Sequence, residues 1–262
     1  MTEVVADVMD PARANALLVA LGRAADLETG APLPPFFHQL YFWAPQPPDR
    51  LGPDGHPAVG QGLIPDMGLP RRMWAGGRLA FLAPLRAGQR AERLSRCEDA
   101  VHKQGRSGPM GLVTLCHEIR QDGQLRVREM QDLVYVPAPD PTAPRRITPA
   151  RADEETRHEV RFDSTLLFRY SALTCNGHRI HYDLDYARDV EGYAGLVVHG
   201  PLLAQLLMLW AAQELGPLSA FDFRALSPVM HVEVVTLCRA GQDLWVRGPD
   251  GRLCMTAQAV SE

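Results

Sequence analysis

The most strongly apolar helical segment of the chain is GPLLAQLLMLWAAQELG, at residues 200–216. It opens with Gly-Pro and closes at Gly216, which are typical start and stop signals of a helix. Apolar residues occur nearly all round the predicted helix, so the segment predicts a buried central helix. A second helix is predicted over 10–28, where Asp10 and Pro11 suit the N-cap and the first helical turn.

Alternating and β-branched residues dominate two other regions. Segments between 78 and 136 are separated by turn-forming AGQ, QGRSG and QDGQ, which predicts an antiparallel meander. The last region, 221–261, shows the same character, with PDGR at 249–252 as a hairpin turn. Both halves of the chain are therefore expected to contribute a sheet.

Two segments lie between these regions. FDSTLLFRYSALT, at 162–174, is a short apolar run that we interpret as a strand. HYDLDYARDVEGY, at 181–193, predicts a short helix capped by Asp183 and ending near Gly192.

The sequence also suggests an internal duplication. FLAPL at 81–85 and ALSPV at 225–229 are each an apolar strand broken by proline and followed by a meander, and a polar, proline-rich run at 137–159 separates the halves. We place a first repeat at 1–140, a linker at 141–160 and a second repeat at 161–262. In the place of a central helix the first repeat offers only the aromatic segment FFHQLYFW, at 36–43. From pattern alone, this indicates an α+β fold that has been duplicated.

Composition restricts the class of ligand. The formal charge of −4 and the pI near 6.1 argue against nucleic-acid and anionic-membrane binding, which usually require a basic excess. The five cysteines show no paired spacing, the N-terminus has no basic and apolar leader, and no apolar run reaches about 18 residues. We expect a cytoplasmic protein, with reduced cysteines, that acts on a small molecule.

Candidate chemistry is concentrated in NGHRIHYD at 176–183 and in EGYAGLVVHGPL at 191–202. Together these stretches resemble the MaoC-like (R)-specific enoyl-thioester hydratases. The similarity is greatest to their tandem-hotdog branch, which includes type 2 hydroxyacyl-thioester dehydratases and the mesaconyl-C4-CoA and itaconyl-CoA hydratases. The first half supports the branch through RMWAGGRLAFLAPLRAGQ and EMQDLVYV. The resemblance implies a double hotdog, with two antiparallel sheets each wrapped on a central helix.

The resemblance also implies site residues. The family signature is Asp-x-Asn-Pro-x-His-x-Asp, in which the first Asp and the His form the catalytic pair. In this chain the signature residues fall, in order, on Asn176, His178, Arg179, His181 and Asp183. The histidine is kept, while the acid is replaced by an amide.

Hydration of an enoyl thioester needs a base for water, a proton for the α-carbon and stabilisation of the charge on the thioester oxygen. His181 suits the base, and Asn176 is expected to hold the water because an amide cannot transfer a proton at neutral pH. Gly200, at the start of the predicted buried helix, is a candidate oxyanion donor through its backbone N–H, whereas Pro201 has none. Without an acid at 176, His181 must either return the proton itself or work with His178 or Asp183.

Other residues are candidate substrate contacts. An arginine of LPRRMWAGGR, foremost Arg72, would suit a free carboxylate on the acyl group, with Arg71 and Arg78 as further candidates. Asp183 is also the predicted helix cap. The full set of expected substrate contacts is His178, Arg179, Asp183, His199 and Arg72.

Several functions stay open at this point. The leading hypothesis is an enoyl-CoA hydratase or 3-hydroxyacyl-thioester dehydratase that uses a CoA thioester as substrate, with no metal and no other cofactor. A hotdog thioesterase and a non-catalytic acyl-thioester-binding protein are the alternatives. A homodimer is also expected, although a double hotdog already contains the pairing that single hotdogs obtain by dimerising.

Overall fold

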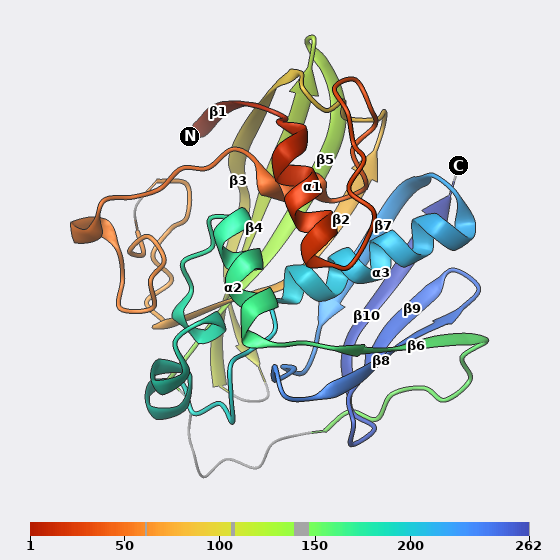
Figure 1. Cartoon of the computed structure of the whole chain (residues 1–262). Coiled ribbons are helices and arrows are strands. Elements are labelled where there is room, and N and C mark those ends of the chain that lie inside the picture. The colour runs from red at the N-terminus through yellow and green to blue at the C-terminus, as the bar shows by residue number, and fades with distance from the viewer. Residues whose placement is uncertain (61, 106–107, 139–146, 262) are drawn as a thin grey trace.

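One antiparallel sheet of ten strands forms the framework of the protein in the computed structural model, which describes residues 1–60, 62–105, 108–138 and 147–261. The strand order is β1-β3-β4-β5-β2-β7-β10-β9-β8-β6 (Figure 1). In the first half the strands are β1 (Thr2–Val8), β2 (Arg71–Phe81), β3 (Arg90–Gly105), β4 (Gly108–Gln121) and β5 (Gln124–Val136). In the second half they are β6 (Thr156–Arg161), β7 (Leu218–Ala225), β8 (Val234–Ala240), β9 (Asp243–Arg247) and β10 (Leu253–Ser261).

Three α-helices accompany the sheet in the described part of the chain. They are α1 (Pro11–Ala20), α2 (Ser164–Leu173) and α3 (Gly200–Leu215). Short 3₁₀ turns occur at η1 (Phe37–Leu40), η2 (Pro48–Arg50) and η3 (Arg179–His181), and one π-helical turn at η4 (Tyr186–Val190). None of the helices described is long and apolar enough to cross a bilayer.

The two halves of the sheet repeat one topology. Reading outward from the centre, the first half runs β2-β5-β4-β3-β1 and the second runs β7-β10-β9-β8-β6, so each strand has a counterpart at the same place. Aligning FLAPL with ALSPV pairs Phe81 with Ala225 and, by the same shift, Arg78 with Asp222. These last two residues lie directly opposite each other in the β2–β7 ladder. The approximate twofold axis of the duplication therefore passes between them.

The segment 162–174, predicted as a strand, is helix α2 instead. Asp163 caps it, with its carboxylate accepting a hydrogen bond from Leu166 N at 2.7 Å. Leu167, Tyr170 and Ser171 are buried at helical spacing, which turns the apolar run into one face of a helix. The topology explains this result, because α1 follows β1 and is capped by Asp10 in the same way.

The remaining sequence predictions differ from the structure chiefly at the ends of elements. The helix predicted over 10–28 begins as expected but ends at Ala20. Edge strand β1 was not predicted. Edge strand β6 begins within the range 141–160 that was predicted as a linker and ends one residue beyond it, and residues 141–146 of that range lie outside the described residues. The predicted meanders are confirmed, and β9 and β10 pair across the PDGR turn.

The predicted central helix is confirmed as α3, which crosses the sheet and packs on strands β7, β9 and β10 of its own half and on β2 of the other (Figure 1). Ten of its residues are buried. In the first half the short turn η1 takes the corresponding place. Phe37 in this turn and Phe36 and Tyr41 on either side of it are buried in the same core as α3. Burying each such side chain contributes about 1.5–3 kcal/mol. The first half therefore completes its core with α3 rather than with a full helix of its own.

Candidate active site

A cavity of about 880 Å³ lies between the two halves of the protein. The second half lines it with the signature loop and the start of α3, and the first half lines it with strands β2 to β5 and the loop before β2. Such a volume is typical of small-molecule sites. Four predicted site residues of the second half meet there, namely Asn176, His178, His181 and Gly200.

His181 presents one ring nitrogen to this cavity. Its Nδ1 lies 2.7 Å from the carbonyl oxygen of Val197, and because a carbonyl only accepts, Nδ1 carries the proton. Nε2 is therefore the acceptor. Burial lowers the pKa of His181 to about 4, although the bond to Val197 acts in the opposite direction. The imidazole is neutral at physiological pH, as a general base must be.

His199, predicted to contact substrate, lies behind His181 instead. The two rings stack with centroids 3.6 Å apart, and His199 Nε2 lies 2.8 Å from the hydroxyl of Ser171 on α2. His199 is fully buried and is not among the residues that line the cavity. Burial holds its pKa well below the usual range, so it stays neutral. Its place indicates that it fixes the plane of the His181 ring.

Asn176 shapes the signature loop and faces the cavity. Its side-chain oxygen accepts a hydrogen bond from His178 N at 3.0 Å, which closes a local turn. The side chain of Asn176 also lies close enough to His56 to raise the pKa of that imidazole. Asn176 thus lies between its own loop and a residue of the first half.

The loop that carries His56 is docked onto the signature loop by backbone contacts. Arg179 N donates to the carbonyl of Asp54 at 2.9 Å, and the Arg179 guanidinium donates to the carbonyl of Pro53 at 3.1 Å. Gly55 and Gly177 cross so closely that a Cβ on Gly55 would lie 2.1 Å from the oxygen of Gly177, and a Cβ on Gly177 would lie 2.7 Å from the oxygen of Gly55. Two glycines are required because only they permit this approach.

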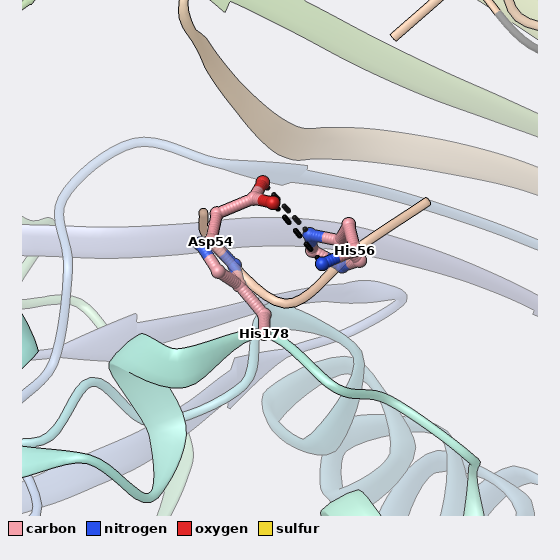
Figure 2. Close-up of side chains that lie close together, drawn as sticks. All are labelled: Asp54, His56 and His178. Carbon is pink, nitrogen blue, oxygen red and sulfur yellow. Dashed lines mark hydrogen bonds and ion pairs between the residues drawn. The ribbon is translucent and has the colours of Figure 1, made fainter. Parts of the chain in front are cut away.

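Figure 2 shows the polar cluster that this docking creates from Asp54, His56 and His178. The Asp54 carboxylate lies 3.2 Å from His56 Nδ1 and accepts from His56 N at 3.0 Å. The His56 and His178 ring centroids are 4.5 Å apart, and those of His178 and His181 are 5.4 Å apart. One carboxylate oxygen of Asp54 and one ring nitrogen each of His56 and His178 lie within 4.8 Å of one another. Three metal ligands could have this spacing.

Burial dominates the electrostatics of this cluster. It lowers the pKa of His178 to about 2, with the neighbouring His56 and His181 adding to the effect. It also lowers the pKa of His56, although the bond to Asp54 counteracts it. Burial opposes ionisation of Asp54, but the hydrogen bonds from His56 prevail and lower its pKa to about 2. At neutral pH, the cluster holds one carboxylate beside neutral imidazoles.

Sequence reasoning missed Asp54 and His56. They lie in DGHP, inside a glycine- and proline-rich stretch that resembles an ordinary surface turn. An acid and a histidine two residues apart were the only local signal. Their role depends on docking against a loop more than a hundred residues away in the sequence.

Of the predicted arginines, only Arg72 lines the cavity. Arg71 is bound to Glu191 at 2.7 Å, and Arg78 to Asp132 at 2.6 Å. Arg72 forms no ion pair with a carboxylate among the described residues, and it lies close enough to His56 and to His178 to lower the pKa of each.

Arg179 and Asp183 form a structural pair rather than a lining of the cavity. Their side chains meet at 2.7 Å, and Asp183 accepts a further bond from Tyr186 N at 3.0 Å. That bond lies at the start of the helical segment that begins at Leu184 and continues as the π-helical turn η4, so Asp183 caps this segment as predicted. Arg179 and Asp183 therefore hold the signature loop, and neither lines the cavity.

Gly200 begins the 16-residue helix α3 and lines the cavity. The first N–H groups of a helix have no partner within the helix, and the helix dipole makes them attractive to negative charge. Pro201 follows and has no N–H. Gly200 N therefore lies at the end of α3 whose backbone donors favour a negative charge.

A second polar cluster lines the cavity on the side of the first repeat. Buried Glu129 accepts from His38 at 2.9 Å and from Gln39 at 2.7 Å, and Ser95 lies 2.7 Å from His117 on the adjoining strand. Burial opposes ionisation of Glu129, yet the bond to His38 lowers its pKa. In the segment 36–43, the aromatic side chains thus belong mainly to the core, while His38 and Gln39 line the cavity.

Comparison with known proteins places this site in a family. The pattern that defines hydroxyacyl-thioester dehydratase type 2 matches residues 36–231, which include both loops of the cavity. The chain belongs to this family. A mesaconyl-C(4)-CoA hydratase of Chloroflexus aurantiacus is 44% identical over 259 residues, covering 92% of this chain and 90% of that protein. The mitochondrial type 2 hydroxyacyl-thioester dehydratase of Schizosaccharomyces pombe is 26% identical over 250 residues, covering 82% and 80%.

Solved structures confirm the fold expected of a type 2 hydroxyacyl-thioester dehydratase. HtdX of Mycobacterium tuberculosis has a TM-score of 0.70 at 18% identity, with full coverage of both chains. Another M. tuberculosis protein, described as having a double hotdog fold, has a TM-score of 0.59 at 14% identity and covers 98% of this chain and 94% of its own. This member of the family is therefore a double hotdog and a hydro-lyase.

Replacing Gly177 with alanine tests the docking of the two loops. The added Cβ would meet the backbone oxygen of Gly55, so we expect the loops to separate and kcat/KM to fall about 10- to 100-fold, as for a small misplacement of catalytic groups. Steady-state kinetics on an enoyl-CoA substrate measure the effect, and circular dichroism checks the fold. Wild-type kcat/KM in Gly177→Ala would contradict the role given to this contact.

Proposed function

We propose that this protein adds water across the 2,3-double bond of a short enoyl-CoA, with His181 as the base, Asn176 as the group that holds water and Gly200 as the oxyanion donor. The observation that carries the proposal is the convergence of a neutral histidine acceptor and a helix-terminal N–H on one cavity. The family membership and the 44% identity to a hydratase support the same chemistry.

The proposed reaction follows from these groups. His181 Nε2 removes a proton from water as the oxygen bonds to the β-carbon, and charge moves to the thioester oxygen. Gly200 N–H, assisted by the dipole of α3, stabilises that charge. Asn176 orients the water. The chemistry uses side chains, backbone and water, with CoA as part of the substrate and no cofactor.

The proposed acyl group is short and carries a free carboxylate, as in mesaconyl-C4-CoA or itaconyl-CoA. Arg72 supports this choice, since it lines the cavity beside His56 and His178 and forms no ion pair with a described carboxylate. A guanidinium in that setting suits a carboxylate through two parallel hydrogen bonds. We assign the shaping of the acyl pocket to the first repeat, 1–140, and the catalytic groups named above to the second, 161–262.

A second candidate is the reverse reaction on a 3-hydroxyacyl thioester of fatty acid synthesis. The family match and the mitochondrial yeast relative favour it. A thioesterase and a non-catalytic acyl-thioester binder are the remaining alternatives. A cytoplasmic location and a homodimer stay predictions.

One assay separates these functions. The purified protein is incubated with mesaconyl-C4-CoA and with crotonyl-CoA while enoyl absorbance and free thiol are followed. We expect absorbance to fall without thiol release, and faster with the dicarboxylic substrate. Thiol release would indicate a thioesterase, and binding without turnover of either substrate would contradict the proposed activity.

Replacing His181 with alanine is expected to lower kcat about 10²- to 10⁴-fold, the range typical of removing a general base. Stopped-flow hydration assays measure it. His158→Ala is the matched control, because His158 is exposed on β6 and does not line the cavity. Near-native turnover by His181→Ala would remove the central assignment.

Asn176→Asp tests the amide. The carboxylate can still accept the bond from His178 N, so we expect kcat to stay within about tenfold of the wild type. Asn176→Ala loses that bond and is expected to fall about 10- to 100-fold. If Asn176→Asp is as inactive as Asn176→Ala, the NH₂ group of the amide is required. The expectation that an oxygen at this position is sufficient would then be wrong.

A further inference from the structure

The reaction needs a proton for the α-carbon, and two polar residues of the signature loop do not supply it. Asn176 stands where the family signature has an acid, and an amide does not ionise at neutral pH. Asp183 of the same loop is bound to Arg179 and to the backbone of η4, away from the cavity. Of the imidazoles in the loop, His181 is already the base for water. The ring of His178 has no hydrogen-bonded carboxylate among the described residues to stabilise its charged form, whereas the ring of His56, outside the loop, has one.

We propose that His56, oriented by Asp54, is this second proton-transfer group and is contributed by the first repeat. The inference rests on the proposed hydratase function and completes it. His56 is the catalytic residue in this assignment, because it lines the cavity, and Asp54 is a positioning residue that acts through it.

The hydrogen bonds of His56 match this role. Asp54 is held to His56 twice, through the ring Nδ1 at 3.2 Å and through the backbone N at 3.0 Å. A carboxylate at Nδ1 fixes the proton there and leaves Nε2 to exchange protons, while its charge stabilises the imidazolium once formed. His56 lines the same cavity as Asn176, the residue that replaces the signature acid.

The backbone holds this ring in place. The Gly55–Gly177 crossing and the bond from Arg179 N to the Asp54 carbonyl fix the loop of His56 against the signature loop. The two backbones can approach this closely because each loop has a glycine at the contact. The charged and titratable groups that interact with His56 are Asp54, Arg72, His178 and His181.

The proton balance closes with three imidazoles. His181 Nε2 takes a proton from water while the C–O bond forms at the β-carbon, and the electrons of the double bond move to the α-carbon and thioester oxygen. His178, whose ring contacts those of His181 and His56, accepts this proton and passes one to His56. The His56 imidazolium gives its proton to the α-carbon as the enolate electrons form the C–H bond. All three rings end neutral, and one water has been added.

The test compares His56→Ala, His56→Gln and Asp54→Asn with the wild type and the His158→Ala control, using mesaconyl-C4-CoA and crotonyl-CoA. We expect His56→Ala to lose about 100-fold or more in kcat with little change in KM, and added imidazole to restore part of the loss. His56→Gln fills the site but transfers no proton, so it should be as slow and should not respond to imidazole. Asp54→Asn should lose about 10- to 100-fold.

Three outcomes would overturn the proposal. In the first, the wild type hydrates the substrate and the kcat of His56→Ala stays within about twofold of the wild-type value. The second is a slow His56→Ala that imidazole does not rescue and whose loss is reproduced in the wild type by a metal chelator, which would make the cluster a metal site. The third is a wild type that hydrates neither substrate, which would also remove the function on which the proposal rests and is recognised without any variant.

Discussion

The pairing of β2 with β7 is the constraint on which the rest of the structure depends. It joins two five-stranded halves into one sheet, with Arg78 opposite Asp222 at the centre. Gly76 is required there, because a Cβ would lie 2.5 Å from the backbone oxygen of Phe223. With the halves joined, α3 can fill the core of both, and the first half can dispense with a central helix of its own. The cavity lies between the two halves, beside η1 and the start of α3.

Desolvation sets the chemistry of the cavity. The imidazoles of His56, His178 and His181 are neutral because burial disfavours their charged form, and Asp54 stays ionised because His56 bonds to it. His199 and Ser171 support His181 from behind, so its acceptor nitrogen faces the cavity. We propose that the site is shared between the repeats: the second supplies His181 and Gly200, and the first supplies Arg72 and His56, to which Asp54 is bound.

What the sequence predicted correctly was carried by strong local patterns. Helix α3 has a continuous apolar pattern, the two meanders have an alternating pattern, and the signature loop has a polar one. All of them were predicted from the sequence. Helix α2 was predicted as a strand because a short apolar run fits both structures, although Asp163 provides an N-cap signal just before it. Strands β1 and β6 are exposed edges, whose pattern is weak. Asp54 and His56 could not be found locally, because a tertiary contact between two glycine-containing loops brings them to the site.

The most direct test of the account is a crystal structure of the protein with the CoA thioester of the hydrated product bound. We expect the thioester oxygen about 3 Å from Gly200 N, with the β-hydroxyl at His181 Nε2 and the α-carbon toward His56. We also expect the free carboxylate of a dicarboxylic acyl group to lie on Arg72. An acyl group bound outside the cavity between the repeats, or one that contacts residues of the second repeat only, would contradict a site shared by both repeats.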